Sequence, residues 1–168
     1  DFEFAESLLG KAVETAPDDP AARTALAEHL HRVKRGSEAL QQLDELSEEA
    51  RDGVNALSLR ANILRDLGRQ EEEVAILSGL AATQPRVDSY LLRMGHAYRT
   101  LGRSDGAIAA YRRVLQKQPF EGTSWWSLAN LKTFKFSDDD IATMERGLAV
   151  SSEMPYNRIR LHFALGKA

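Results

Sequence analysis

The chain has 168 residues, of which 28% are charged and 43% are hydrophobic, and it contains no Cys. That composition fits a globular or repeat domain, and it excludes a disulfide framework, a thiolate metal site and a cysteine nucleophile. The formal net charge is only −3 and no run of 18 apolar residues is present, so we expect no nucleic acid and no membrane among the partners.

Apolar residues recur at helical spacing along the whole chain, which predicts an all-α protein of about nine helices. In chain order we expect a single helix at 2–15, helix hairpins at 20–51, 54–84, 88–118 and 122–151, and a truncated helix at 156–168. Gly68 and Gly102 fall in the turns of two hairpins, where Gly adopts a left-handed conformation at little cost. Three Ser residues stand where second helices start and are predicted to cap them: Ser37, Ser104 and Ser137.

The hairpins repeat with a period of 34 residues. At this step a column of small residues runs through the first helices as Ala27, Ala61, Gly95 and Ala129. A column of larger residues runs through the second helices as Leu9, Leu43, Leu77 and Tyr111, and three units close on Pro17, Pro85 and Pro119. Small residues let paired helices approach closely, large residues fill the space between them, and Pro ends the second helix.

One unit carries a recognisable signature, formed by Leu91, Met94, Gly95, Tyr98, Ala107, Tyr111 and Pro119. These residues reproduce the spacing W-x2-L-G-x2-Y, then A-x3-F, then P, with Leu91 in place of Trp. The chain therefore resembles the tetratricopeptide-repeat family over nearly its whole length. The resemblance implies a single array over residues 1–168, in which stacked antiparallel hairpins form a right-handed superhelix, or solenoid, and first helices line a concave groove.

Residues 125–168 carry a narrower resemblance, in the segments Trp125–Asp138 and Arg160–Ala168. They are similar to the last repeats before the catalytic domain in bacterial proteins that fuse tetratricopeptide repeats to a sulfotransferase. This resemblance implies that the parent protein transfers sulfate from 3'-phosphoadenosine 5'-phosphosulfate and uses the repeats as a substrate-recognition arm. The chain itself has no strand followed by a Gly-rich phosphate-binding loop, so we expect no catalytic site and no cofactor in it.

The His pair and the acidic clusters have structural explanations. His29 and His31 lie two residues apart on a helix and point to different faces, so they cannot chelate a metal as an i, i+4 pair does. The clusters Glu71–Glu73 and Asp138–Asp140 open predicted helices, where the helix dipole favours negative charge. We therefore expect no metal site and no catalytic carboxylate pair.

The repeat register directs a set of first-helix residues into the predicted groove. The expected groove residues are Asn62, Arg65, Leu92, His96, Arg99, Trp126, Asn130 and Thr133, with Thr24, Glu28, His31 and Ser58 at equivalent positions of the earlier hairpins. Asn can hydrogen bond a peptide backbone, Arg pairs with carboxylates, and Trp126 offers an aromatic anchor. The alternative is that these residues only solvate the inner wall. Trp125 occupies the column of the repeat's core Trp and is predicted to be structural.

Three functions are compatible with these features. The first is a protein–protein interaction module, or scaffold, whose groove binds an acidic or tyrosine-containing protein segment. The second is the recognition arm of a sulfotransferase. The third is an assembly part, in which exposed helical ends join copies into a homo-oligomer.

The charge is unevenly distributed along the chain. Residues 1–53 carry 6 basic and 13 acidic side chains, whereas residues 54–168 carry 16 and 12, which gives the later groove a positive character. The sequence starts at Asp1 without an initiator Met, so we expect a cut piece of a larger protein. Its compartment is predicted to be the cytoplasm.

Overall fold

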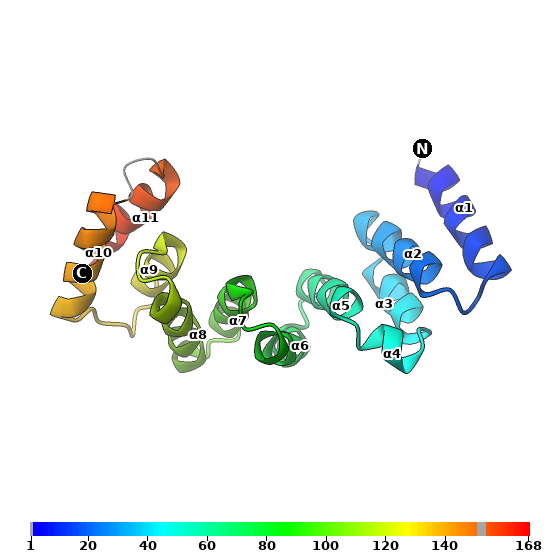
Figure 1. Cartoon of the computed structure of the whole chain (residues 1–168), viewed down its shortest axis with the longest axis horizontal. Coiled ribbons are helices and arrows are strands. Elements are labelled where there is room, and N and C mark those ends of the chain that lie inside the picture. The colour runs from blue at the N-terminus through cyan, green and yellow to red at the C-terminus, as the bar shows by residue number, and fades with distance from the viewer. Residues whose placement is uncertain (1, 151–153) are drawn as a thin grey trace. The chain divides into compact units, whose positions relative to one another are not determined.

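The computed structural model describes residues 2–150 and 154–168, which form eleven helices and no strand (Figure 1). The predicted all-helical architecture is confirmed, but the described helices outnumber the nine expected. The predicted segments, one single helix, four hairpins and one truncated helix, already hold ten helices, and residues 48–51 form an extra turn that Ser47 caps by accepting a hydrogen bond from Ala50 N (3.4 Å). The predicted end of the fourth hairpin, residue 151, lies outside the described residues.

The chain divides into two compact units, residues 1–83 and 84–168. Unit 1 contains α1 (Phe2–Thr15), α2 (Pro20–Arg32), α3 (Gly36–Asp44), α4 (Glu48–Arg51), α5 (Val54–Asp66) and α6 (Gln70–Thr83). Unit 2 contains α7 (Asp88–Thr100), α8 (Ser104–Lys117), α9 (Gly122–Ala129), α10 (Asp138–Val150) and α11 (Pro155–Leu165). Among the described residues, none of these helices combines the length and apolar composition that crossing a membrane requires.

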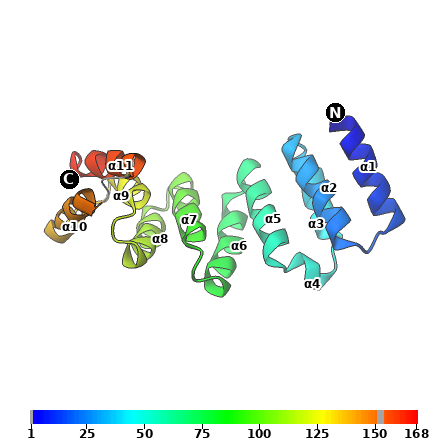
Figure 2. The ribbon, with the colours of Figure 1, turned by 45° about the horizontal axis from the view of Figure 1, so that its top comes forward.

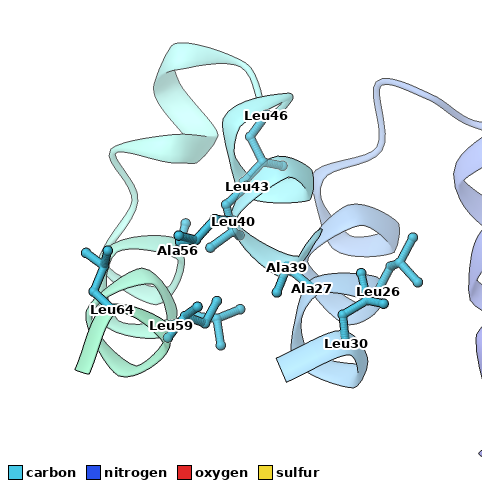
Figure 3. Packing of buried hydrophobic residues seen from close by; sticks show 11 residues of the cluster. Leu26, Ala27, Leu30, Ala39, Leu40, Leu43, Leu46, Ala56, Leu59 and Leu64 are labelled. Atoms are coloured by element: carbon cyan, nitrogen blue, oxygen red, sulfur yellow. The ribbon is translucent and has the colours of Figure 1, made fainter. Parts of the chain in front are cut away.

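In unit 1, α2 pairs with α3 and α5 pairs with α6, while α1 packs on α2 (Figure 2). The core side chains from α2, α3 and α5 meet between these helices (Figure 3): Leu26, Leu30, Leu40, Leu43, Leu59, Ile63 and Leu64. Ala27 and Ala39 are fully buried beside them, which permits the close helix approach that the small-residue column predicts. Helix α1 contributes no buried residue and is held by the partly buried Leu9 and Val13.

The turns between paired helices share one geometry. Gly68 and Gly102 adopt positive φ angles of 74° and 71°, as predicted, and Lys34, one period earlier, adopts 67°. The residue after each of them donates its backbone N–H to the carbonyl five residues earlier at 2.9 Å, as in Arg35 to Leu30. This is the Schellman arrangement that satisfies the last carbonyls of a helix.

In unit 2, α7 and α8 form a close hairpin in which the missing side chain of Gly95 makes room for Tyr111. A Cβ atom built on Gly95 would lie 2.3 Å from Cε1 of the Tyr111 ring. Helix α9 is only eight residues long, and it packs mainly on α11. Asn157 of α11 fixes this contact, because its Oδ1 accepts from Gly122 N (2.7 Å) and its Nδ2 donates to Phe120 O (2.9 Å).

The start of α10 is anchored by an ion pair between the buried Asp140 and the partly buried Arg112. Asp140 accepts two hydrogen bonds from the Arg112 guanidinium of α8, one of them at 2.6 Å, and a third from Ser137 N (3.0 Å). Ser137 Oγ accepts from Asp140 N (3.2 Å), so this Ser caps its helix as predicted. The Arg112 guanidinium lies 5.5 Å from the Trp125 ring centroid and 5.0 Å from that of Phe134. Trp125 is buried, in agreement with its predicted structural role.

Candidate functional site

The eight predicted groove residues are divided between the units. Asn62 and Arg65 lie on α5 of unit 1, and the other six belong to unit 2. Leu92, His96 and Arg99 are on α7, and Trp126 is on α9. Asn130 and Thr133 follow the end of α9 at Ala129, so the prediction that they sit on a first helix is wrong.

The early end of α9 has a physical cause. Asn130 Nδ2 donates to Trp126 O (2.8 Å), which satisfies a carbonyl of the last helical turn. Beyond it, Phe134 and Phe136 turn back onto the core, with ring centroids 5.0 Å apart and Phe136 6.2 Å from Trp125. The chain therefore leaves the helix where its aromatic residues can be buried, and Thr133 is left exposed in the loop.

Unit 1 has a groove between its first helices α2 and α5, with a volume of about 520 Å³. Its lining comprises Pro20, Ala21, Thr24, Ala25, Glu28, Ala50, Gly53, Val54, Asn55 and Ala56. Thr24 and Glu28 belong to the predicted groove columns, whereas Asn62 and Arg65 do not line this cavity. Asn55 was missed because it lies one turn before the columns on which the prediction was based.

Arg65 is exposed, but its charge is partly matched by its neighbour. Its Nε lies 3.3 Å from Asp66 Oδ1, and the other Asp66 oxygen lies 3.0 Å from His31 Nε2 and 3.8 Å from Lys34 Nζ. The hydrogen bond from His31, with the nearby positive charge of Arg65, lowers the pKa of Asp66 despite some desolvation. Other arginines of unit 1 are also paired, in Arg23–Glu45, Arg35–Glu6, Arg35–Glu38, Arg60–Asp44 and Arg69–Glu72.

On α7 of unit 2 the three predicted residues have different surroundings. Leu92 is partly buried against the core, and His96 Nδ1 lies 2.8 Å from the hydroxyl of the buried Tyr111. Burial lowers the pKa of His96, and the positive charge of Arg99 lowers it further. Burial also raises the pKa of Tyr111. Arg99 is exposed and, within the part of the chain that the structure describes, forms no ion pair.

Trp126 takes part in an aromatic cluster with α11. Its ring centroid lies 6.1 Å from that of Phe163, and Lys167 Nζ lies 5.8 Å from the Phe163 ring. The exposed Arg160 adjoins α9, because a Cβ on Gly122 would lie 3.1 Å from Arg160 Cβ. Arg160 and Lys167 were not predicted as site residues, because the predicted groove columns were followed only through the four complete hairpins and α11 lies beyond them.

Some of the carboxylates in the clusters Glu71–Glu73 and Asp138–Asp140 form ion pairs with arginines. Glu72 pairs with Arg69, Glu73 is buried, and Asp140 pairs with Arg112, while Asp138 and Asp139 are exposed at the start of α10. Across residues 2–150 and 154–168, no three His, Asp or Glu side chains are grouped as a metal site would require.

Comparisons with known proteins identify the repeat. Two family models described as tetratricopeptide repeat match, one over residues 1–63 and the other over residues 92–131. Similar solved structures include MamA, at 14% identity over 99% of this chain and 86% of that one, with a TM-score of 0.68. No curated protein matches the sequence.

Two further solved structures are tetratricopeptide-repeat proteins. The one from Parabacteroides merdae is 22% identical over 99% of this chain and 68% of its own, with a TM-score of 0.70. The thermophilic protein from Thermus thermophilus is 21% identical over 98% of this chain and 90% of its own, with a TM-score of 0.58. At these identities the similarity establishes the fold.

Proposed function

We propose that this chain, which is built from tetratricopeptide repeats, is a scaffold that binds an extended protein segment along its first helices and catalyses no reaction itself. One observation carries the proposal. The first helices bury one side in the core, yet at the repeat's groove columns they keep partly or fully exposed polar side chains: Thr24, Glu28, Asn62, Arg65, His96 and Arg99. Such side chains can hydrogen bond a peptide without disturbing the fold.

The expected ligand is acidic and contains an aromatic residue. Arg99 has no carboxylate partner of its own among the described residues, so its guanidinium is available for bidentate pairing with a ligand carboxylate. Trp126 and Phe163 offer partly exposed aromatic surface, which often supplies much of the binding energy in protein interfaces. Arg65 contributes less in this proposal, because Asp66 already accepts hydrogen bonds from it.

A peptide array tests this function directly. We expect acidic, tyrosine-containing peptides to bind the chain, and Arg99→Ala to weaken the best of them by about tenfold, the typical loss of one charged hot-spot contact. Arg113→Ala is the matched control, since Arg113 is also exposed but lies on the second helix α8. Equal binding by the Arg65→Ala, Arg99→Ala double variant and the native chain would refute a role for these two arginines in binding an acidic ligand.

A second candidate is the recognition arm of a sulfotransferase, which the resemblance of residues 125–168 supports. The coding sequence around this chain tests it. A strand followed by a Gly-rich phosphate-binding loop downstream of Ala168 is the expected finding, and a different domain there would remove the sulfotransferase assignment while leaving the scaffold function intact.

We also propose that the scaffold forms a homo-oligomer through exposed helical ends. Eight of the eleven exposed large apolar side chains in the described residues lie in the first eight or the last nineteen residues: Phe2, Phe4, Leu8, Val150, Met154, Tyr156, Ile159 and Phe163. Several large apolar side chains exposed close together in the sequence favour association with another protein surface.

A further inference from the structure

The imidazole of His96 is held by a hydroxyl inside unit 2. Its Nδ1 lies 2.8 Å from the Tyr111 hydroxyl of α8, and the two ring centroids are 5.6 Å apart. Tyr111 is fully buried with its ring packed against Gly95, which fixes the position of the hydroxyl. The other ring nitrogen, Nε2, has no partner in the part of the chain that the structure describes, and it is not buried. His96 therefore offers one nitrogen, in a fixed place, to a ligand.

A second buried hydroxyl adjoins the first. Ser127 Oγ of α9 is fully buried and unpaired among the described residues, and it is near enough to Tyr111 to lower the pKa of that hydroxyl against the effect of burial. A hydroxyl can both donate and accept, and it rotates to suit its neighbours. Beside neutral His96, Tyr111 can donate to Nδ1 and accept from Ser127. Beside protonated His96, Tyr111 can accept from Nδ1–H and donate to Ser127, so the two hydroxyls suit both charge states.

The charged groups that act on His96 are Arg99, one turn along the same side of α7, and Glu121 at the N-cap of α9. Burial and the positive charge of Arg99 lower the pKa of His96, whereas Glu121 opposes them. The Glu121 carboxylate is already engaged, because it accepts from Thr123 N (2.9 Å) and Ser124 N (2.6 Å). Within the described residues, His96 and Arg99 thus form a pair of groups that lacks a carboxylate of its own.

We propose that His96 and Arg99 together bind one side-chain carboxylate of the ligand, and that His96 takes up a proton from solvent as this carboxylate binds. The inference rests on the proposed binding of an acidic segment and names the residues that read its charge. A carboxylate beside the imidazole favours the protonated ring, whose Nε2–H donates to it while Arg99 pairs with the same group. Tyr111 and Ser127 are positioning residues, since Tyr111 accepts the second N–H of the protonated ring and donates to Ser127.

Calorimetry with probe peptides tests this pairing. The acidic probe is Glu-Glu-Tyr-Glu with both ends blocked, and the neutral probe has Gln in place of each Glu. We expect the acidic probe to bind more tightly as the pH falls from about 8 to about 6, by up to tenfold per pH unit, because one proton is taken up with it. Arginine and glutamate side chains keep their charges over this range. A neutral probe with a free C-terminal carboxylate should show no such gain, and an equal gain there would overturn the side-chain assignment.

Three variants assign the pH dependence to its residues. His96→Gln should bind the acidic probe with no pH dependence. Tyr111→Phe keeps the ring beside Gly95 but removes the hydroxyl, so we expect unchanged helix content by circular dichroism and a smaller gain in affinity on acidification. The control is His162→Gln, at an exposed histidine of α11, which should keep the native dependence.

The results separate this inference from the proposed function. Affinity that does not change with pH, or the same pH dependence in the native chain and His96→Gln, would overturn the pairing while the acidic ligand still stands. Native behaviour of Tyr111→Phe would overturn the positioning role of its hydroxyl. A chain that binds the acidic probe no better than the neutral one at every pH would overturn both the pairing and the acidic ligand.

Discussion

At the level of single residues, the small residue of each first helix matches the size of the residue that it faces on the paired second helix. Ala27 and Ala61 occur in hairpins whose second helices carry Leu43 and Leu77, whereas Gly95 occurs where the second helix carries Tyr111. The columns themselves could be predicted from the 34-residue period. Why position 95 carries Gly rather than Ala could be explained only from the position of the Tyr111 ring in the structure.

This packing predicts a specific cost for Gly95→Ala. We expect a loss of about 1–3 kcal/mol in the free energy of unfolding, because the new methyl group would overlap the Tyr111 ring and force helix or ring to shift. Urea denaturation measures it. The control is Gly79→Ala in α6, where no atom lies within 4 Å of the added Cβ, and a gain of about 0.5–1 kcal/mol is expected from helix propensity. A destabilised Gly79→Ala variant would contradict this reasoning.

Lys34 carries backbone strain that Gly68 and Gly102 avoid. Its φ of 67° places a residue with a Cβ in the left-handed region. We expect Lys34→Gly to stabilise the chain by about 1 kcal/mol, measured as a shift of the urea midpoint. Lys34→Ala separates backbone from charge, because it also removes the ammonium group 3.8 Å from Asp66 but leaves the strain in place. Equal stabilisation by both variants would show that the backbone is not the cause.

At the level of elements, the sequence located the helices better than their ends. Ser137 caps α10 as predicted, but the predictions for Ser37 and Ser104 were wrong. Arg35 and Arg103 occupy the cap positions of α3 and α8, and neither makes a side-chain cap hydrogen bond. The Schellman turns explain the difference, because they place the cap position two residues before Ser37 and one residue before Ser104.

The anchor of α10 predicts a pH dependence. Burial raises the pKa of Asp140, but hydrogen bonds from Arg112 and Ser137 outweigh it and leave the pKa below its usual range. A depressed folded-state pKa gives stability that is present above the unfolded-state pKa, about 4, and is lost as the pH falls through the folded-state value. The Asp140–Arg112 pair therefore stabilises the fold at neutral pH.

We expect Asp140→Asn to lower the free energy of unfolding at pH 7 by about 1–3 kcal/mol, since it leaves a partly buried guanidinium without its carboxylate. The difference from the native chain should shrink as the pH falls below about 4. Urea titrations at several pH values measure both effects. Asp139→Asn, at an exposed neighbouring site, should change stability by less than about 0.5 kcal/mol, and a pH-independent loss in Asp140→Asn would argue against the ion pair.

At the level of the whole molecule, the two units differ in the sign of their net charge. Unit 1 has 9 basic and 17 acidic residues, and unit 2 has 13 and 8. The sequence indicated this polarity, but it could not show which cations are available to a ligand. Arg65 and Arg99 occupy the same column one period apart, yet Asp66 follows Arg65 where Thr100 follows Arg99. The repeat column does not take the neighbouring residue into account. An acidic residue next to an arginine nevertheless decides how much of its positive charge is available to a ligand.

The lack of buried residues in α1 also makes this helix a reporter. None of its own side chains is fully buried, so its amides should exchange hydrogen for deuterium at a low opening free energy, whereas those of the well-packed α8 should require larger openings. Anything that covers Phe4 and Leu8 would slow exchange in α1 before it affects the core. Helix α1 would thus record, amide by amide, when its outer face is occupied.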